Sequence, residues 1–351
     1  MRTTYKDEDV TLLLKDITGL AEPLPGSERE KRIQSGTHYC EMLPLEYEPT
    51  EKYMQAYYEA VRNYSEMTAE AAARVSRMIV SEKGSDTVLV SLARAGTSAG
   101  VLIKRYIKLA FGYDVPHYSI SIIRGRGIDK NALNYITERH GTKGIQFIDG
   151  WTGKGAIKRQ LDEALRDFPD IDNSLAVLSD PARTAEKSGT TDDFLIASSC
   201  LNSTVSGLIS RTFLRSDIIG EKDFHGAAYY GELRERDLTY HFIDSVCTFL
   251  PEFRDIAEGK PSCPTGAGLE EAKSIAEHFG IDDINLVKPG IGEATRVLLR
   301  RVPWKILVND MNDEKYLGHI FRLAQEKGVP VEEYPLENYR ACGLIRKLAD
   351  S

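Results

Sequence analysis

The sequence has few cysteines and no long hydrophobic stretch. Its 351 residues include five cysteines, at positions 40, 200, 247, 263 and 342, and no two of them form a CxxC pair. This spacing excludes a disulfide framework and a zinc ribbon as the basis of the fold. No apolar run approaches the ~20 residues that cross a bilayer, and the acidic residues 1–9 are unlike a signal or transit peptide. We therefore expect reduced thiols, a cytoplasmic location and no membrane partner.

The chain also has fewer basic than acidic residues. The chain has 45 lysines and arginines against 53 aspartates and glutamates, which gives a formal net charge of −8. A negative protein lacks the broad electrostatic attraction of non-specific DNA binding, although a local basic patch can still bind RNA. No DNA partner is expected.

The length and a hydrophobic content of 42% suffice for two cores. A composition break rich in proline and glycine at residues 258–268 is the predicted linker. It separates a first domain, residues 1–257, from a second domain, residues 269–351. Residues 1–50 are rich in turns and are predicted to wrap around the first domain.

Apolar strand patterns alternate with amphipathic helix patterns along the first domain. The predicted strands are 87–92, 118–123, 145–149 and 175–179. The predicted helices are 51–82, 97–110, 130–140 and 155–167. Strands spaced by helices indicate an α/β fold with a parallel sheet and helices on both faces.

The most informative stretch is residues 145–156, where an apolar strand ends at Asp149 and passes into a glycine-rich turn. Thr152, Gly153, Lys154 and Gly155 combine a hydroxyl, an ammonium and flexible amides before a helix. Such a loop at a helix start is suited to a phosphate group. The alternative is an ordinary strand-to-helix connection with glycines for tight packing.

A second loop of the same kind follows the strand at 87–92. Arg94, Ala95 and Gly96 lie between that strand and the next helix, and they are predicted to bind a pyrophosphate. Because the carboxyl ends of parallel strands share one edge of a sheet, both loops should face one crevice.

These loops, with the runs at 118–129 and 200–212, resemble a bacterial family encoded with tellurite-resistance and stress genes. That family is described as a phosphoribosyltransferase-like domain joined to a pelota-type RNA-binding domain. Its members also carry the label of cysteine protease StiP. The resemblance implies the type I phosphoribosyltransferase fold, although the second acid of that signature is Gly150 here and Thr152 follows Asp149 by only three residues.

The resemblance further implies transfer of a ribose phosphate group from phosphoribosyl pyrophosphate or a related donor. Asp149 would hold the ribose hydroxyls, and Mg²⁺ would arrive on the donor's pyrophosphate without a metal site in the protein. Arg124 and Arg126, between glycines, are predicted to close on the leaving group, or else form a flexible turn. Asp180 is a candidate for the acceptor substrate, and the alternative is a simple Asp-Pro turn.

The second domain shows a helix at 269–279, a strand at 304–308, a helix at 314–327 and a strand near 329–334. This α-β-α pattern resembles pelota and the L7Ae-type RNA-binding domains. Four cations are predicted to bind structured RNA, and the alternative is a solvated helix face: Lys288, Arg296, Arg300 and Arg301.

Two rival functions remain beside the transferase. One is a non-catalytic regulator that senses a nucleotide while the second domain binds RNA. The other is a cysteine protease in which Cys200 is the nucleophile and His225 its base, although a cysteine packed as a small hydrophobe is the commoner case. A homodimer is left open.

Overall fold

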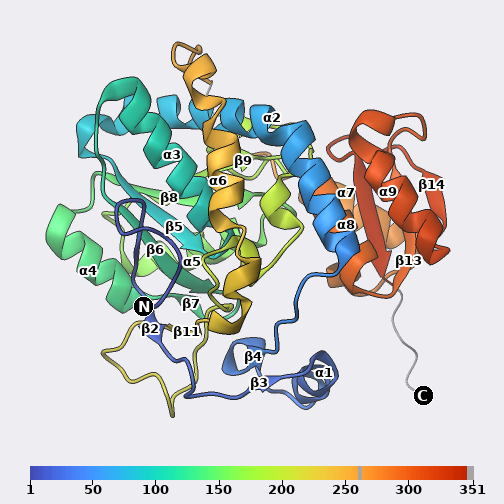
Figure 1. Ribbon diagram of the computed structural model, residues 1–351, viewed down its shortest axis with the longest axis horizontal. Coiled ribbons are helices and arrows are strands. Elements are labelled where there is room, and N and C mark those ends of the chain that lie inside the picture. Colours follow the sequence, from blue (N-terminus) through green and yellow to red (C-terminus); the bar gives the residue numbers. More distant parts are fainter. Residues whose placement is uncertain (260–262, 346–351) are drawn as a thin grey trace.

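The computed structural model describes residues 1–259 and 263–345 (Figure 1). The predicted linker, 258–268, therefore lies partly outside the described residues. The helices of the described part are α1 (Gly26–Gln34), α2 (Glu51–Lys83), α3 (Ala95–Phe111), α4 (Lys130–His140), α5 (Ala156–Ala164), α6 (Thr239–Cys247), α7 (Ala267–His278), α8 (Ile291–Arg300) and α9 (Glu314–Lys327).

The strands of the first part are β1 (Thr11–Leu12), β2 (Lys15–Asp16), β3 (Pro23–Leu24), β4 (Leu43–Pro44), β5 (Val88–Ala93), β6 (His117–Ile123), β7 (Gly127–Ile128), β8 (Ile145–Trp151), β9 (Leu175–Ser179), β10 (Lys187–Thr190) and β11 (Gly226–Ala227). Those of the C-terminal part are β12 (Val287–Pro289), β13 (Pro303–Val308), β14 (Val331–Glu333) and β15 (Ala341–Ile345).

The main sheet has the order β1-β6-β5-β8-β9-β10, and every neighbouring pair in this path is parallel. The short strand β7 is added to β6 in the antiparallel sense. The predicted parallel sheet with helices is therefore confirmed, and each of its four predicted strands begins within one residue of the observed strand.

Helices cover both faces of this sheet. Leu89 of β5 packs in the cluster that includes α2 and α3, whereas Val88 and Val90 pack in the cluster that includes α4 and α5. A strand buried on both faces needs a continuous apolar run, which is why β5 was recognisable in the sequence. Figure 1 shows α6 packed over α2 and α3, and α2 extending towards the C-terminal part.

The loops after β5 and β8 lie close together at the carboxyl edge of the sheet. A Cβ atom at Gly96 would lie 2.4 Å from the carbonyl oxygen of Ile148. Only glycine permits this approach, so the residue at the start of α3 fixes the distance between the two loops.

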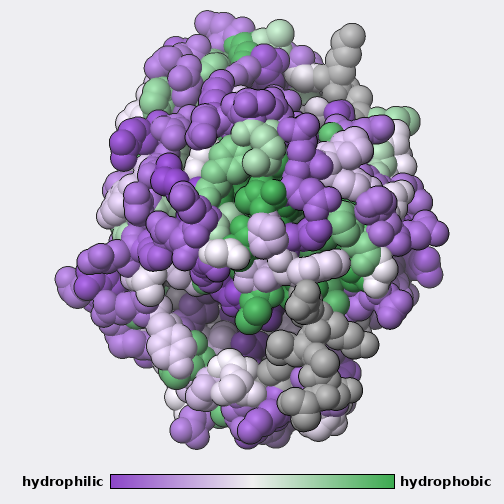
Figure 2. All heavy atoms as spheres, turned by 90° about the vertical axis from the view of Figure 1, so that its right-hand side faces the viewer, coloured by the Kyte–Doolittle hydropathy of each residue, from purple (hydrophilic) through white to green (hydrophobic). Residues whose placement is uncertain are grey.

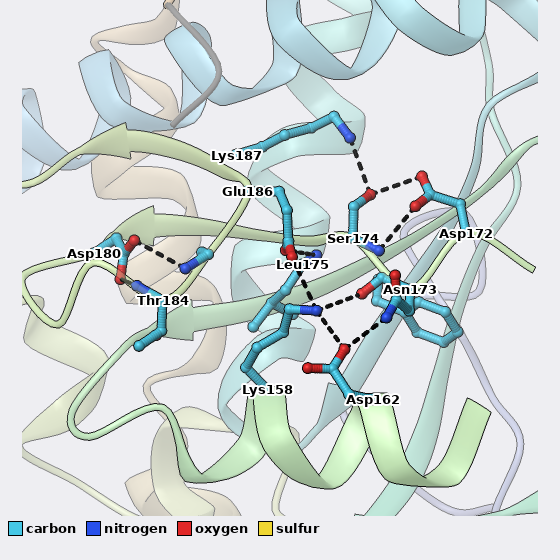
Figure 3. A network of polar contacts seen from close by, with 12 residues as sticks. Lys158, Asp162, Asp172, Asn173, Ser174, Leu175, Asp180, Thr184, Glu186 and Lys187 are labelled. Carbon is cyan, nitrogen blue, oxygen red and sulfur yellow. Dashed lines mark hydrogen bonds and ion pairs between the residues drawn. The ribbon is translucent and has the colours of Figure 1, made fainter. Parts of the chain in front are cut away.

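Two lysines of the first part, Lys187 and Lys158, form polar contacts beside the main sheet, as Figure 3 shows. The ammonium of Lys187 lies 3.0 Å from the Ser174 hydroxyl and 2.8 Å from Glu82. Lys158 pairs with Glu186 at 2.9 Å and also contacts Asp162. These pairs join α5 and α2 to β9 and β10, so both lysines stabilise the sheet.

The leader forms structure of its own beside the first part. Strand β1 pairs with β6 and so extends the main sheet, whereas β3 and β4 form a separate pair near α1. Between α1 and β4 the chain makes a single turn of 3-10 helix, Tyr39–Glu41.

The C-terminal part is a mixed sheet of order β12-β15-β13-β14. Helices α8 and α9 cover one face and α7 the other. Strand β15 lies in the middle of this sheet but was not predicted, because its sequence, Ala-Cys-Gly-Leu-Ile, is short and contains glycine.

The two parts share a hydrophobic cluster, in which Ile291 and Leu298 of α8 join the residues of α2 and the loop at Phe194. In the described residues, no helix combines the length and apolar character needed to cross a bilayer.

Candidate functional site

A cavity of about 490 Å³ opens at the carboxyl ends of β5 and β8. The loops after both strands line it, as the sequence analysis predicted, and so does the C-terminal part through residues of β12 and α8. The site therefore lies between the two parts of the chain.

Asp149 lines this cavity at the end of β8. Its carboxylate accepts a hydrogen bond of 2.8 Å from the amide of Gly150. Asp149 is half-buried in the cavity wall, and the partial burial raises the pKa of its carboxyl group to about 7. The group is therefore able to exchange a proton near neutral pH.

The loop of Thr152, Gly153, Lys154 and Gly155 also lines the cavity, but its polar groups have protein partners. Lys154 donates to the carbonyl oxygens of Ile284 at 2.5 Å and Val287 at 2.9 Å. Burial lowers the pKa of Lys154 to about 8. The ammonium assigned to a phosphate thus ties the first part to the C-terminal part.

Thr152 and Asp180 form a second internal contact of this loop. The Thr152 hydroxyl donates to Asp180 at 2.5 Å, and Asp180 also accepts from the amides of Thr184 and Ala185 at 3.0 and 2.9 Å. Figure 3 shows the bond between Asp180 and Thr184. Asp180 is fully buried and does not line the cavity, so the geometry gives it a structural role and not contact with an acceptor.

Arg94 and Ala95 line the cavity and Gly96 does not. The guanidinium of Arg94 donates to the carbonyl of Ile209 at 2.9 Å and to the amide oxygen of Asn202 at 3.3 Å. These bonds hold the guanidinium against a neighbouring loop. Fewer of its N–H groups therefore remain available to a ligand in the cavity.

The structure separates Arg124 from Arg126. Arg124 lines the cavity and donates to the side chain of Asn285 at 3.2 Å, whereas Arg126 is turned away and pairs with Glu41 at 2.9 Å. The expectation that both arginines meet one leaving group does not fit this geometry.

The four cations predicted to bind RNA do not form one exposed strip. Arg296 pairs with Glu293 at 2.8 Å and donates to the Ser199 carbonyl at 2.8 Å, and Arg300 donates to the Cys200 carbonyl at 2.7 Å. These two arginines hold α8 against the first part. Lys288 and Arg296 line the cavity, and Arg301 alone of the four is exposed.

Cys200 has no catalytic partner among the described residues. Its side chain is fully buried, and this burial raises the pKa of the thiol to about 12. The ring of His225, the predicted base, instead lies 2.8 Å from the Ser121 hydroxyl. The structure does not bring the predicted pair together.

A different cysteine lies beside a histidine. The sulfur of Cys40 is 2.9 Å from Nδ1 of His38, across the turn Tyr39–Glu41. The amide of Cys40 also donates to Nδ1 at 3.4 Å, so Nδ1 faces both the thiol and this amide. No other hydrogen bond between a cysteine and a histidine side chain is formed in residues 1–259 and 263–345.

This pair lies next to the cavity. Tyr39 lines the cavity, its ring centroid is 4.5 Å from that of His38, and its hydroxyl accepts from the Arg124 amide at 3.0 Å. A Cβ atom at Gly125 would lie 3.7 Å from Nε2 of His38, so the loop at 124–127 lies against the ring. The sequence analysis did not identify this pair, although the sequence places a histidine two residues before a cysteine at 38 and 40.

Metal ligands are not gathered in the described part. It contains no group of three or more His, Cys, Asp or Glu side chains placed to hold an ion. The expected Mg²⁺ was to arrive with a diphosphate donor, so neither that ion nor its donor is tested by this arrangement.

Comparisons with known proteins bear on the whole chain. Residues 3–247 match a family model described as tellurite-like stress resistance cysteine protease StiP, and residues 266–347 match one described as PELOTA RNA binding domain. A protein of Acinetobacter baylyi named cysteine protease StiP is 36% identical over 364 aligned positions, which cover 98% of this chain and 94% of that protein.

The family resemblance stated from the sequence is thereby confirmed, but the main function drawn from it is wrong. The matching family and the relative are named as cysteine proteases and not as phosphoribosyltransferases. The protease alternative is the better one.

Proposed function

The chain belongs to the StiP family, and we propose on that basis that it is a cysteine peptidase. We assign Cys40 as the nucleophile and His38 as its base. The observation that carries this assignment is the 2.9 Å separation between the Cys40 sulfur and His38 Nδ1. A thiol and an imidazole within hydrogen-bond reach are the minimum equipment of such an enzyme.

The reaction follows from that contact. The Cys40 thiol gives its proton to His38 Nδ1, and the sulfur attacks the carbonyl carbon of a peptide bond. A carbon–sulfur bond forms, the carbon–nitrogen bond breaks, and the leaving amine takes the proton from His38. Water then attacks the thioester with His38 as base, which releases the carboxylic acid and restores the thiol.

Local charges set how readily the thiol ionises. Burial raises the pKa of Cys40 to about 11, the positive charge of Arg126 acts in the opposite direction, and Glu41 raises the pKa further. The resting side chain is therefore a thiol at neutral pH. Its proton has to leave during the reaction, and the adjacent His38 is placed to take it.

Access to the sulfur is restricted in the described arrangement. Cys40 is only 1% exposed, and its sulfur lies 3.7 Å from the carbonyl oxygen of Leu214. Cleavage on this proposal requires the turn at 39–41 to separate from the segment at Leu214. The same closure would keep the resting thiol away from other proteins.

The assignment is tested with a peptide-based electrophile that alkylates thiol nucleophiles. The full chain is treated with one equivalent, the remaining cleavage of an unfolded protein substrate is measured, and the modified residue is mapped by mass spectrometry. We expect the adduct on Cys40, in proportion to the activity lost. Loss of activity with the adduct on Cys200, Cys247 or Cys342 would overturn the assignment.

We also propose that the main sheet is a variant of the type I phosphoribosyltransferase fold, without its transfer chemistry. Support comes from the loops after β5 and β8, which line one cavity at the carboxyl edge of a parallel sheet. Superposition of a crystal structure on that fold tests this point.

RNA binding by residues 266–347 is a second proposal, because the model that matches them is described as an RNA binding domain. Figure 2 views the molecule from the side of this part and shows hydrophilic residues over most of the face, around a hydrophobic area. Arg296 and Arg300 are engaged with the first part and Lys288 lines the cavity, so we assign the phosphate contact to Arg301, the exposed one of the four.

Filter binding of the full chain to structured RNA at rising salt tests the second proposal. Affinity should fall with salt, because phosphate contacts release counterions. Arg301→Glu should weaken binding, and Arg166→Glu, on the exposed surface of the first part, should not. No binding at low salt would contradict it.

A further inference from the structure

The cavity beside Cys40 and His38 has an excess of positive charge. Of its charged lining residues, two are acidic, Asp149 and Glu293, whereas the basic ones are Arg94, Arg124, Lys154, Lys158, Arg211, Lys288 and Arg296. Several of these cations are neutralised or engaged inside the protein. The question is which charges remain available to a ligand.

Arg211 and Lys288 remain available. Within the described part of the chain, neither side chain forms a hydrogen bond or an ion pair, although both line the cavity. Arg124 adds a third cation, which donates only to the amide oxygen of Asn285. The three come from separate segments, and they converge on one space of about 490 Å³.

Lys288 is half-buried, whereas Arg211 and Arg124 line the cavity from exposed positions. Burial lowers the pKa of Lys288. A cation that has lost part of its hydration without gaining a partner favours the entry of an anion. The cavity is therefore prepared for a negatively charged group.

The acids of the cavity do not cancel this charge. Glu293 is paired with Arg296 at 2.8 Å, and burial raises the pKa of Asp149 to about 7, so that Asp149 is partly neutral at physiological pH. An anion is therefore expected at Arg211 and Lys288, away from Asp149.

The loop that the sequence analysis assigned to phosphate offers little to such an anion. Lys154 is bound to two carbonyl oxygens, and the Thr152 hydroxyl to Asp180. The anion has to be recognised by long side chains from different segments, in a space much larger than a phosphate nest. A carboxylate on a peptide suits this arrangement, since guanidinium groups bind carboxylates in the fork geometry.

The cavity adjoins a second hollow that reaches His38. Arg124 and Lys288 line the cavity and also a neighbouring hollow to which His38 contributes. Tyr39 lies in both spaces, next to His38 in the chain. A peptide held by its carboxylate in the cavity would therefore pass the turn that carries Cys40.

We propose that this cavity is the specificity site of the peptidase, and that Arg211, Lys288 and Arg124 bind a carboxylate of the substrate peptide. The preferred substrates are then peptides with an acidic residue or a free C-terminus near the cleaved bond. This inference rests on the proposed function, because it names the substrate class of the same site.

Binding is measured without turnover, using the full chain with Cys40→Ser. Four fluorescent peptides of one sequence combine Glu or Gln at a single position with a free or an amidated C-terminus. Fluorescence anisotropy gives each Kd. We expect the Glu peptide, the free-acid peptide or both to bind about 10- to 100-fold more tightly than their neutral partners, as charge-assisted hydrogen bonds imply.

Variants identify the cations responsible. Arg211→Met and Lys288→Met should each reduce the preference for the carboxylate, and Lys288→Arg should keep it. Arg166→Met, remote from the cavity, is the matched control. Circular dichroism checks that each variant is folded, and the two independent positions keep the test valid if one variant fails to fold.

The outcomes separate this inference from the proposed function. Cleavage by the wild type with equal binding of Glu and Gln peptides, and of free and amidated ones, overturns the inference and leaves the peptidase standing. A preference that survives both Met variants also overturns it. Carboxylate-dependent binding without any cleavage keeps the cavity assignment and rejects the peptidase, whereas binding of inorganic phosphate in place of peptide carboxylates rejects the inference.

Discussion

Cys40 and Cys200 are both buried cysteines, yet their surroundings differ in the one feature that matters for chemistry. Cys40 has an imidazole nitrogen 2.9 Å from its sulfur and lies in a turn beside the cavity. Cys200 is packed in the cluster between the two parts of the chain, and among the described residues its sulfur has no hydrogen bond to a histidine.

The comparison teaches that burial alone does not decide the role of a cysteine. Burial raises the pKa of both thiols, to about 11 for Cys40 and about 12 for Cys200. A raised pKa makes a poor nucleophile unless a base takes the proton. Only Cys40 has that base.

The largest expected effect comes from removing His38, the base that distinguishes Cys40 from Cys200. Replacing His38 by Ala should lower kcat/KM for peptide cleavage by about 10²- to 10⁴-fold, because the thiol loses its proton acceptor. His225→Ala is the matched control and should change kcat/KM little. Equal losses in the two variants would show that His38 acts only through folding.

The next effect concerns thiol reactivity. Alkylation with iodoacetamide, followed by mass spectrometry, should modify the exposed Cys263 and the half-buried Cys247 first, Cys40 next and the fully buried Cys200 and Cys342 last. Cys40 should react before Cys200 and Cys342 because opening of its turn exposes it without unfolding the core. Modification of Cys200 before Cys40 would reverse the comparison.

A smaller effect sharpens the electrostatics at Cys40. Its alkylation rate should rise roughly tenfold per pH unit below its pKa, because only the thiolate reacts. Arg126→Met removes the charge that lowers this pKa and leaves Glu41, which raises it. The variant should therefore react more slowly than the wild type at pH 8 to 9, and Arg62→Met should not. A faster reaction in Arg126→Met would contradict the sign.

The smallest effect assigns Cys200 its structural role. Cys200→Ala removes a sulfur from a packed cluster and should lower the unfolding free energy by about 1–3 kcal/mol. Urea denaturation measures this loss. Peptide cleavage at a temperature where the variant is folded should be unchanged, and a loss of cleavage without a loss of stability would speak against packing.

The sequence predicted the main sheet well because its strands are buried on both faces and have continuous apolar runs, such as Val88–Ala93. It also predicted that the loops at Arg94 and Asp149 share a cavity, because parallel strands end at one edge. These features depend on local pattern and on general rules of topology.

The sequence did not predict which polar groups of those loops remain free. Lys154 binds carbonyl oxygens 130 and 133 residues away, and Arg296 turns towards the first part. Long-range partners of this kind leave no local signal. His38 and Cys40 are close in sequence and did give a local signal. It was not used because residues 1–50 were predicted only to wrap around the first domain.

The central claim is tested most directly by comparing Cys40→Ala with Cys200→Ala in one assay of peptide cleavage, with both variants shown to be folded. We predict that Cys40→Ala has no cleavage above background and that Cys200→Ala keeps most of the wild-type rate. Cleavage that survives in Cys40→Ala but is lost in Cys200→Ala would contradict the account.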